Sequence, residues 1–357
     1  MPIESSPKSC IYNHVEFTAF KITIYELEDK EAMGILHIGT KWVSDGLSDK
    51  FHGWSHHNPV LISAQTGRGK NHFIMSEIIP YALQNGQQVF LFSNRVALNV
   101  QQKRELLKTL SIPNIHSDEE LHQISNFGPV TIFDYQSALK FLSAYGTNYP
   151  IGGFPFSGRP GWGYAIFDEA HFFVSDALFN SRTESIFQKL VYAFSYYTRI
   201  YLTATPENII PVIDHYERTN QERRRLTHYE LYKLCPGERD YNSSKDDVLN
   251  IFEFPRDYSN YNVNFFGDFS EIYSIMNQNK PNKEKWLFFV NSLERQEVLA
   301  KELSEKTKKK IDRFDSSKKN NTPVWKKLID GTIPNDVLLT TSALDNGLNI
   351  TDVKHSG

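Results

Sequence analysis

The segment AQTGRGKN, at Ala64–Asn71, has the composition of a loop that binds phosphate groups. It follows the apolar stretch VLISA and precedes a stretch with helical spacing, the context that such a loop requires. Gly67 and Gly69 free the backbone to direct successive N–H groups at phosphate oxygens, and the helix N-terminus adds a partial positive charge. The alternative is an ordinary glycine-rich turn before a helix. The residues predicted to bind a nucleotide here are Ala64, Gln65, Thr66, Gly67, Arg68, Gly69, Lys70 and Asn71.

Two positions in this loop carry the chemistry. Lys70 is expected to reach the β- and γ-phosphates of a nucleoside triphosphate, ATP being the usual one. The position of Asn71 is normally a Ser or Thr whose hydroxyl binds Mg²⁺. Because the amide oxygen of Asn71 is also a hard ligand, we expect Mg²⁺ binding to be weakened and not abolished.

The acidic segment FDEAH, residues 167–171, ends the apolar stretch YAIFD. Carboxylates at the carboxyl end of a parallel strand stand at the mouth of the sheet, beside a phosphate loop. We expect Asp168 to hold Mg²⁺ through water and Glu169 to polarise the attacking water. His171 is included in the nucleotide site, which it would couple to a second lobe. A lone DEAH string more often marks a helix start, so the prediction depends on the strand and the loop.

The elements that position these residues alternate between short apolar runs and helical stretches, which indicates a parallel sheet covered by helices. The expected strands of a first lobe are 60–64, 89–93, 130–134, 164–168 and 200–204, with helices from about 70 and over 96–110, 136–142 and 174–193. The alternation resumes with strands at 286–290, 309–314 and 337–341 and helices at 293–305 and 324–329.

This pattern divides the 357 residues into four segments. They are a lead-in (1–53) with a β-like stretch at 17–25, an ATP-binding lobe (54–208), an insertion and linker (209–263) with a basic cluster at 222–225, and a partial second lobe (264–357).

The bulk composition excludes several classes of protein. A hydrophobic fraction of 40% and a charged fraction of 23% are ordinary for a globular protein, and no apolar run is long enough to cross a membrane. The N-terminus lacks a signal-peptide core, and two cysteines cannot form a disulfide framework or a structural zinc site. A reducing cytoplasm is the expected compartment. A net charge of −3 does not by itself indicate nucleic acid, nor does it exclude it, because a protein can bind the phosphate backbone along a local groove.

Taken together, the motifs resemble those of the superfamily 2 DEAD/DEAH-type helicases from about residue 54 to the end. AQTGRGKN resembles motif I, DEAH motif II, and LTATP at Leu202–Pro206 motif III. SNRVALNVQQ (93–102) resembles motif Ia, and TIFDYQSAL (131–139) the segment after it. LFFVNSLERQ (287–296) resembles motif IV, and LLTTSALDNGLNITD (338–352) motif V.

The resemblance implies two RecA-like lobes, use of ATP and Mg²⁺, and hydrolysis coupled to movement on, or separation of, nucleic acid strands. DNA is favoured over RNA because TATP looks more like the motif III of DNA-directed branches than SAT does. By the same resemblance, Thr203, Ala204 and Thr205 would couple hydrolysis to strand binding. The strand-binding groove would be lined by Arg95, Tyr135, Gln136, Thr340 and Thr341. Gly347 and Asn349 would face the nucleotide across the cleft.

Simpler interpretations stay open for some of these positions. Arg95 could be a surface charge at a helix start, and Thr340–Thr341 could end a buried strand. The lysine-rich tract at 306–310 is more typical of a solvated helix end than of a DNA contact.

The chain departs from the family pattern in two places. No glutamine motif precedes the phosphate loop, so the sequence does not support adenine specificity. The sequence also ends before motif VI, whose arginines reach the γ-phosphate. We therefore expect a second lobe truncated at its C-terminus, slow hydrolysis by this chain alone, and an arginine finger supplied by a downstream segment or a partner. Two alternatives are a module that binds ATP and nucleic acid without efficient turnover, and the motor subunit of a restriction or mobile-element complex.

Overall fold

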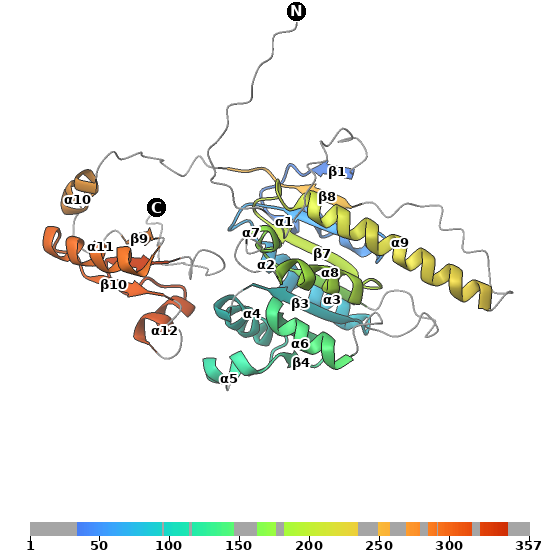
Figure 1. Cartoon of the computed structure of the whole chain (residues 1–357). Coiled ribbons are helices and arrows are strands. Elements are labelled where there is room, and N and C mark those ends of the chain that lie inside the picture. The colour runs from blue at the N-terminus through green and yellow to red at the C-terminus, as the bar shows by residue number, and fades with distance from the viewer. Residues whose placement is uncertain are drawn as a thin grey trace, which may run out of the picture.

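The computed structural model of the chain describes residues 34–94, 96–113, 116–145, 163–175, 182–234, 249–257, 269–278, 285–290, 292–315 and 322–341. Figure 1 shows two α/β units, the first built on a mostly parallel sheet and the second on a parallel one. The α/β class with two parallel-sheet lobes, expected from the sequence, is confirmed.

The first unit contains an eight-stranded sheet in the order β1-β8-β2-β7-β6-β3-β5-β4. All neighbouring strands are parallel except β4 and β5. The strands are β1 (Gly34–His37), β2 (Val60–Ser63), β3 (Gln88–Ser93), β4 (Asn126–Phe127), β5 (Val130–Asp134), β6 (Gly163–Phe167), β7 (Thr198–Thr203) and β8 (Asn250–Glu253). The five strands predicted for this lobe form its centre, within one or two residues of their expected bounds.

The sheet takes in strands on both sides of the range 54–208. Strand β1 comes from the lead-in, and β8, which lies between β1 and β2, comes from the stretch interpreted as an insertion and linker. The first part of that stretch forms one long helix, α9 (Ile210–Leu234), which includes the basic cluster at 222–225. The helix was not predicted because its sequence is mostly polar. Among its described side chains, the buried apolar ones include Val212, Ile213 and Tyr216. The β-like stretch at 17–25 lies outside the described residues.

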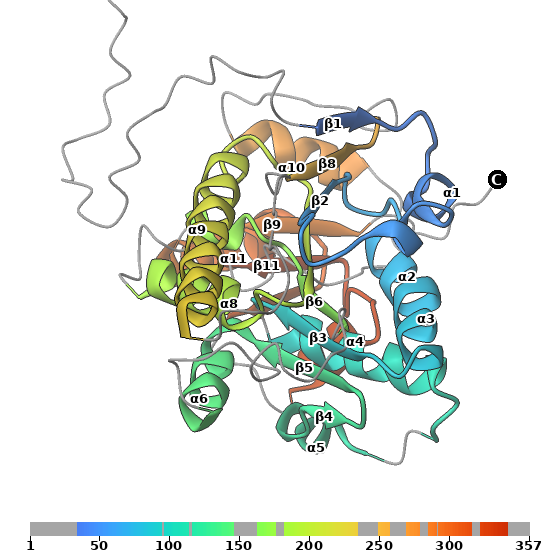
Figure 2. The ribbon, with the colours of Figure 1, turned by 90° about the vertical axis from the view of Figure 1, so that its right-hand side faces the viewer.

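Helices cover both faces of this sheet (Figure 2). Alternate residues of each strand face opposite sides. In β2, Leu61 packs with one set of helices, whereas Val60 and Ile62 pack with the other. The first set is α6 (Tyr135–Tyr145), α7 (Phe172–Ser175), α8 (Thr183–Ala193) and α9; the second is α1 (Val43–Leu47), a 3-10 turn (Phe51–Gly53), α2 (Lys70–Phe73), a π-helical turn (Ile74–Ile78), α3 (Ile79–Gln84) and α4 (Val96–Thr109). Among the helices of the described segments, none is long and apolar enough to cross a bilayer.

The second unit has three parallel strands in the part of the chain described, in the order β10-β11-β9. They are β9 (Trp286–Phe289), β10 (Ile311–Phe314) and β11 (Val337–Thr340). Helices α10 (Phe269–Gln278) and α11 (Leu293–Lys306) pack on one face, and α12 (Pro323–Ile329) packs on the other.

The two units meet where α12 approaches α4 and the short helix α5 (Asp118–Gln123) of the first unit. Trp325 and Leu328 of α12 share an apolar cluster with Val100 of α4. An ion pair of 3.0 Å between Arg104 and Asp330 lies at the same junction. This contact joins the second unit to the helix that begins in the motif Ia segment.

Candidate functional site

The predicted phosphate loop connects β2 to α2 at the carboxyl end of the sheet. Gly67 and Gly69 have φ angles of +81° and +80°, in the left-handed region that favours glycine. The Lys70 ammonium is 8% exposed and donates a hydrogen bond of 2.7 Å to the Ala64 carbonyl, across the loop. Thr66 and Gly67 are exposed. The loop thus offers open backbone above a lysine that is held in place, which is the geometry of an anion site.

Segments from outside the predicted lobe support this loop. The Asp257 backbone N–H, just after β8, donates to Gln65 Oε1 at 3.0 Å. The Asp257 carboxylate lies 3.5 Å from the buried Arg68 guanidinium. The Val43 N–H of α1 donates to the Arg68 carbonyl at 3.1 Å. Sequence reasoning missed both supports, because no local motif marks Val43 or Asp257.

The acidic pair follows β6, which β7 separates from β2. Asp168 is 6% exposed, and its Oδ2 accepts a hydrogen bond of 2.7 Å from Gln102 Nε2. Burial, and then the neighbouring Glu169 charge, raise the pKa of Asp168 to about 7, while the Lys70 charge opposes the rise. The Lys70 ammonium is therefore close enough to act on the Asp168 carboxylate. Glu169 has a φ of +51°, an uncommon conformation for a non-glycine residue.

A contact joins the acidic segment to the LTATP segment at Leu202–Pro206. His171 Nδ1 lies 3.3 Å from Glu169 Oε2 and 3.3 Å from Thr203 Oγ1. Thr203 Oγ1 also accepts from the Thr205 backbone N–H at 3.1 Å, while Ala204 between them is half-buried. The structure therefore brings the three predicted coupling positions next to the acidic segment.

Asn71 has a partner that the sequence did not suggest. Its Nδ2 donates to Glu105 Oε2 of α4, 34 positions away along the chain. Burial raises the pKa of Glu105, and the hydrogen bond from Asn71 opposes the rise. Gln102 and Glu105 lie on the same helix, so α4 contacts both predicted magnesium ligands.

Two residues expected to line the strand-binding groove, Tyr135 and Thr340, are buried in this structure. Tyr135 is 1% exposed because it packs against Phe172, with their rings 5.5 Å apart, and its hydroxyl donates to the Asp168 carbonyl at 2.7 Å. Thr340 is 0% exposed because β11 is the central strand of its sheet. Thr340 therefore ends a buried strand, the simpler interpretation left open by the sequence.

The other predicted contact positions fall in two groups. Gln136 is exposed, next to Tyr135 on α6, and Thr341 is half-buried. Arg95, Gly347 and Asn349 lie outside the described residues.

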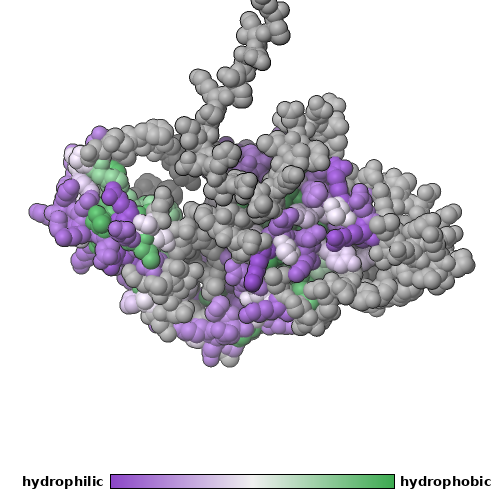
Figure 3. Space-filling model, in the orientation of Figure 1, coloured by the Kyte–Doolittle hydropathy of each residue, from purple (hydrophilic) through white to green (hydrophobic). Residues whose placement is uncertain are grey.

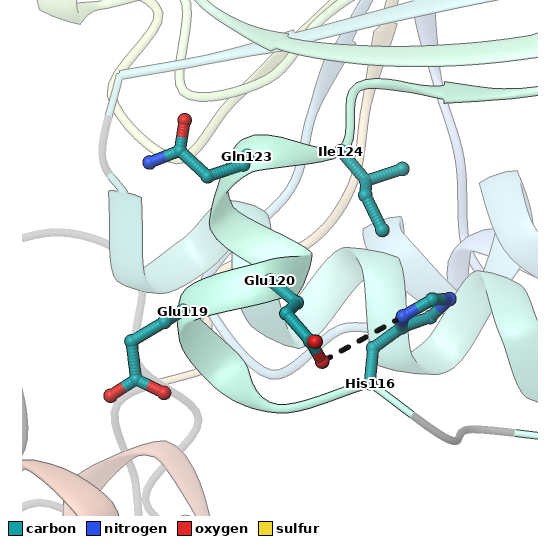
Figure 4. A pocket seen from close by; sticks show the side chains of 5 residues that line it. All are labelled: His116, Glu119, Glu120, Gln123 and Ile124. Carbon is teal, nitrogen blue, oxygen red and sulfur yellow. Dashed lines mark ion pairs between the residues drawn. The ribbon is translucent and has the colours of Figure 1, made fainter.

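A surface hollow of about 490 Å³ lies on α5 (Figure 4). The Glu120 carboxylate is directed at the His116 ring, with 3.8 Å between Oε2 and Nδ1. Glu120 also forms a capping box with Ser117, which accounts for its position at the helix start. The lining is completed by Glu119, Gln123 and Ile124 and contains no predicted site residue, so we assign the hollow no part in the site.

Comparisons with known proteins found one family model and several solved structures that are similar to this chain. A family model described as "Type III restriction enzyme, res subunit" matches residues 19–208. No curated protein matches the sequence. The solved structure of the DEAD-box helicase Mss116 bound to ssRNA and UDP-BeF is similar with a TM-score of 0.55 at 10% identity, over 90% of this chain and 70% of that chain.

Two other solved structures match more weakly. S. cerevisiae Dbp5 bound to RNA and ADP BeF3 has a TM-score of 0.49 at 13% identity, over 83% of this chain and 68% of that chain. The Escherichia coli DEAH/RHA helicase HrpB has a TM-score of 0.49 at 11% identity, over 86% of this chain and 35% of that chain.

The likeness to Mss116 shows a shared fold, and the family match supports a helicase-type protein in general terms. The family model covers more than half of the chain, and it covers the phosphate loop, the acidic segment and motif III. The chain therefore belongs to the type III restriction enzyme res-subunit family, which is of the superfamily 2 helicase type.

Proposed function

We propose that this chain is an ATP-dependent helicase or translocase, which couples ATP hydrolysis to the movement or separation of nucleic acid strands. The observation that carries the proposal is the convergence of Lys70 and the Asp168–Glu169 pair at the carboxyl end of one parallel sheet. Ligands of open α/β sheets bind at this edge. Family membership supports the same conclusion.

The residues of the loop suit a triphosphate. The exposed backbone of Thr66 and Gly67 donates N–H groups to phosphate oxygens, and the Lys70 ammonium leaves the Ala64 carbonyl to bind the β- and γ-phosphates. Glu169 holds the attacking water through its carboxylate, which the contact with His171 orients.

Magnesium fits the residues beside the loop. The amide oxygen of Asn71 and the carboxylate of Asp168 are hard oxygen ligands of the kind that this ion prefers. Burial makes the Asp168 carboxylate costly to ionise, a cost that a neighbouring cation offsets. When bound, the ion neutralises charge that develops on the phosphate oxygens.

The contact between His171 and Thr203 would couple hydrolysis to strand binding, together with Ala204 and Thr205. The groove for the strand would include Arg95, Gln136 and Thr341, with Gly347 and Asn349 at the nucleotide. We favour DNA as the strand, because of TATP in motif III and because the family model is named for a restriction enzyme.

The proposed lobes are those expected from the sequence, with β1, α9 and β8 added to the first because they pack on its sheet. The arginine finger would come from a downstream segment or a partner. The family name also favours the related function of a motor subunit in a restriction complex. One observation favours a module that binds without efficient turnover: an amide, held by Glu105, stands where the family has a hydroxyl.

Nucleotide binding by Lys70 tests the proposal. ATP with Mg²⁺ at about a hundredfold excess over its Kd should stabilise the wild-type chain by about 2.7 kcal/mol. Lys70→Ala should abolish this stabilisation in a thermal-shift assay, whereas Lys140→Ala, an exposed lysine on α6, should retain it. An unchanged shift in Lys70→Ala refutes the assignment. Strand-stimulated hydrolysis that Glu169→Gln abolishes would separate the motor from the binding module.

A further inference from the structure

Helix α4 supports both predicted magnesium ligands from one face. Gln102 Nε2 donates to Asp168 Oδ2 at 2.7 Å, and Glu105 Oε2 accepts from Asn71 Nδ2. Gln102 and Glu105 are three positions apart, which places them on the same side of a helix. The two predicted ligands, one in α2 and one just after β6, are therefore held by a single element.

The hydrogen bond from Asn71 to Glu105 fixes which end of the Asn71 amide faces away from α4. An ionised carboxylate only accepts hydrogen bonds, so it selects the NH₂ end of the amide. The oxygen of the same amide is then directed to the other side. An amide without this partner is free to turn its NH₂ group toward a cation, where it cannot be a ligand.

We propose that Glu105 is a positioning residue for magnesium, which holds the Asn71 side chain so that its oxygen is presented to the cation. The inference rests on the proposed nucleotide site. It explains how an amide can stand at a position where a hydroxyl is usual. A hydroxyl has one oxygen and needs no such partner, whereas an amide has two unlike ends and requires one.

The Gln102 side chain is a second feature that points to a bound group beside α4. It is 1% exposed, and its buried Oε1 has no hydrogen-bond partner among the residues that the structure describes. Its Nε2 already binds Asp168, so the free oxygen lies beside the same carboxylate. A metal-bound water would give this oxygen a donor, since such waters hydrogen-bond to neighbouring polar groups.

The test measures the affinity of a fluorescent ADP analogue for the full chain, in saturating Mg²⁺ and in EDTA. Glu105→Ala should weaken binding about tenfold in Mg²⁺, which is the low end of the roughly 10–100-fold loss typical when a partner of a metal ligand is removed. In EDTA the same substitution should weaken binding by less than about twofold, since no metal is then bound. Glu105→Gln keeps an acceptor for Asn71 Nδ2 but adds a donor that can bind the other end of the amide, so its Mg²⁺-dependent affinity should fall between those of the wild type and Glu105→Ala. Glu119→Ala, an exposed carboxylate on α5, is the matched control.

A second background makes the test specific for the amide. In an Asn71→Thr protein, Glu105→Ala should change the affinity in Mg²⁺ by less than about twofold, because the two effects are coupled. The proposal is overturned if the loss persists in the Asn71→Thr background, or if it is equal in EDTA. It is also overturned if Glu105→Gln loses as much as Glu105→Ala. Failure of the proposed function is distinguishable, because the wild type would then bind nucleotide no better than Lys70→Ala in either condition.

Discussion

A buried ion pair between Arg199 and Glu217 anchors α9 to the first sheet. Arg199 is 0% exposed, and its Nε lies 2.7 and 3.0 Å from the two carboxylate oxygens of Glu217. The remaining donors of Arg199 bind backbone carbonyls, including those of Ser195 and His56 at 2.7 and 2.9 Å. The Tyr201 hydroxyl donates to the same carboxylate at 2.5 Å. Glu217 therefore serves both a buried cation and a buried hydroxyl.

Glu217→Ala should destabilise the protein by about 4 kcal/mol. Removing one partner of a buried ion pair typically costs about 3–5 kcal/mol of stability, because the other charge stays buried without compensation. The Tyr201 hydroxyl also loses its acceptor, but the two losses belong to one network and do not add fully. At about 2–4 °C per kcal/mol for a unit of this size, the melting temperature should fall by roughly 8–16 °C.

Thermal and urea unfolding of the full chain measure this loss. The matched control is Asp214→Ala, which removes a pair of 2.8 Å with Arg218 on the same helix. Because Arg218 is mostly exposed, this control should cost less than about 0.5 kcal/mol. The double variant Arg199→Met/Glu217→Leu should recover much of the loss, because neither charge is then buried. If Glu217→Ala costs no more than Asp214→Ala, the buried pair does not anchor α9.

Two other changes test the packing and the charge of the first unit. Gly163→Ala should cost at least about 3 kcal/mol in urea unfolding, because the φ is +132° and the added Cβ would stand 1.8 Å from the Gln88 carbonyl oxygen. Gly53→Ala, whose Cβ meets nothing within 4 Å, is its control, and equal midpoints would contradict the steric argument. Burial lowers the pKa of Lys103 from 10.5 to about 8, with Asp134 opposing. Because the pKa of Lys103 is lower in the folded than in the unfolded state, the free energy of unfolding of the wild type should rise as the pH rises from 8 to 10.5. Relative to Lys103→Met, which cannot titrate, the rise should reach up to about 3 kcal/mol, at about 1.36 kcal/mol for each pH unit. Stability curves of the two proteins that run parallel over this pH range would refute the prediction.

The sequence alone determined the fold class and the positions of the central strands. The stretches at 60–64 and 164–168 are short, apolar and followed by loop chemistry, and buried parallel strands need little else to be recognised. Because the carboxyl ends of such strands share one edge of the sheet, the sequence also predicted that Lys70 and Asp168 would lie at the same edge. The structure places them there, close enough for the charge of one to act on the pKa of the other.

At the surface of the second unit, the sequence pattern predicted the elements but not which of their side chains would be exposed. Helices α10 and α11 carry a mixture of apolar and charged residues, and Figure 3 shows both kinds on the face of this unit that is in view. The side chains of Phe289, Leu293 and Val298 are exposed, although the sequence patterns at these positions are typical of a strand end and a helix. The local sequence pattern predicted these helices and strands, but it did not predict which of their faces would pack against other elements.

Only the tertiary structure decided the contacts between segments far apart in the chain. Strand β8 lies in the first sheet, an ion pair between Arg199 and Glu217 holds α9 to that sheet, and Asn71 donates a hydrogen bond to Glu105. Tyr135 was buried because its neighbours in space are Phe172 and the Asp168 carbonyl, which its own segment does not reveal. The physical reason is that periodicity records the backbone and one buried face of each element, whereas a long-range hydrogen bond or ion pair depends on how separate elements pack.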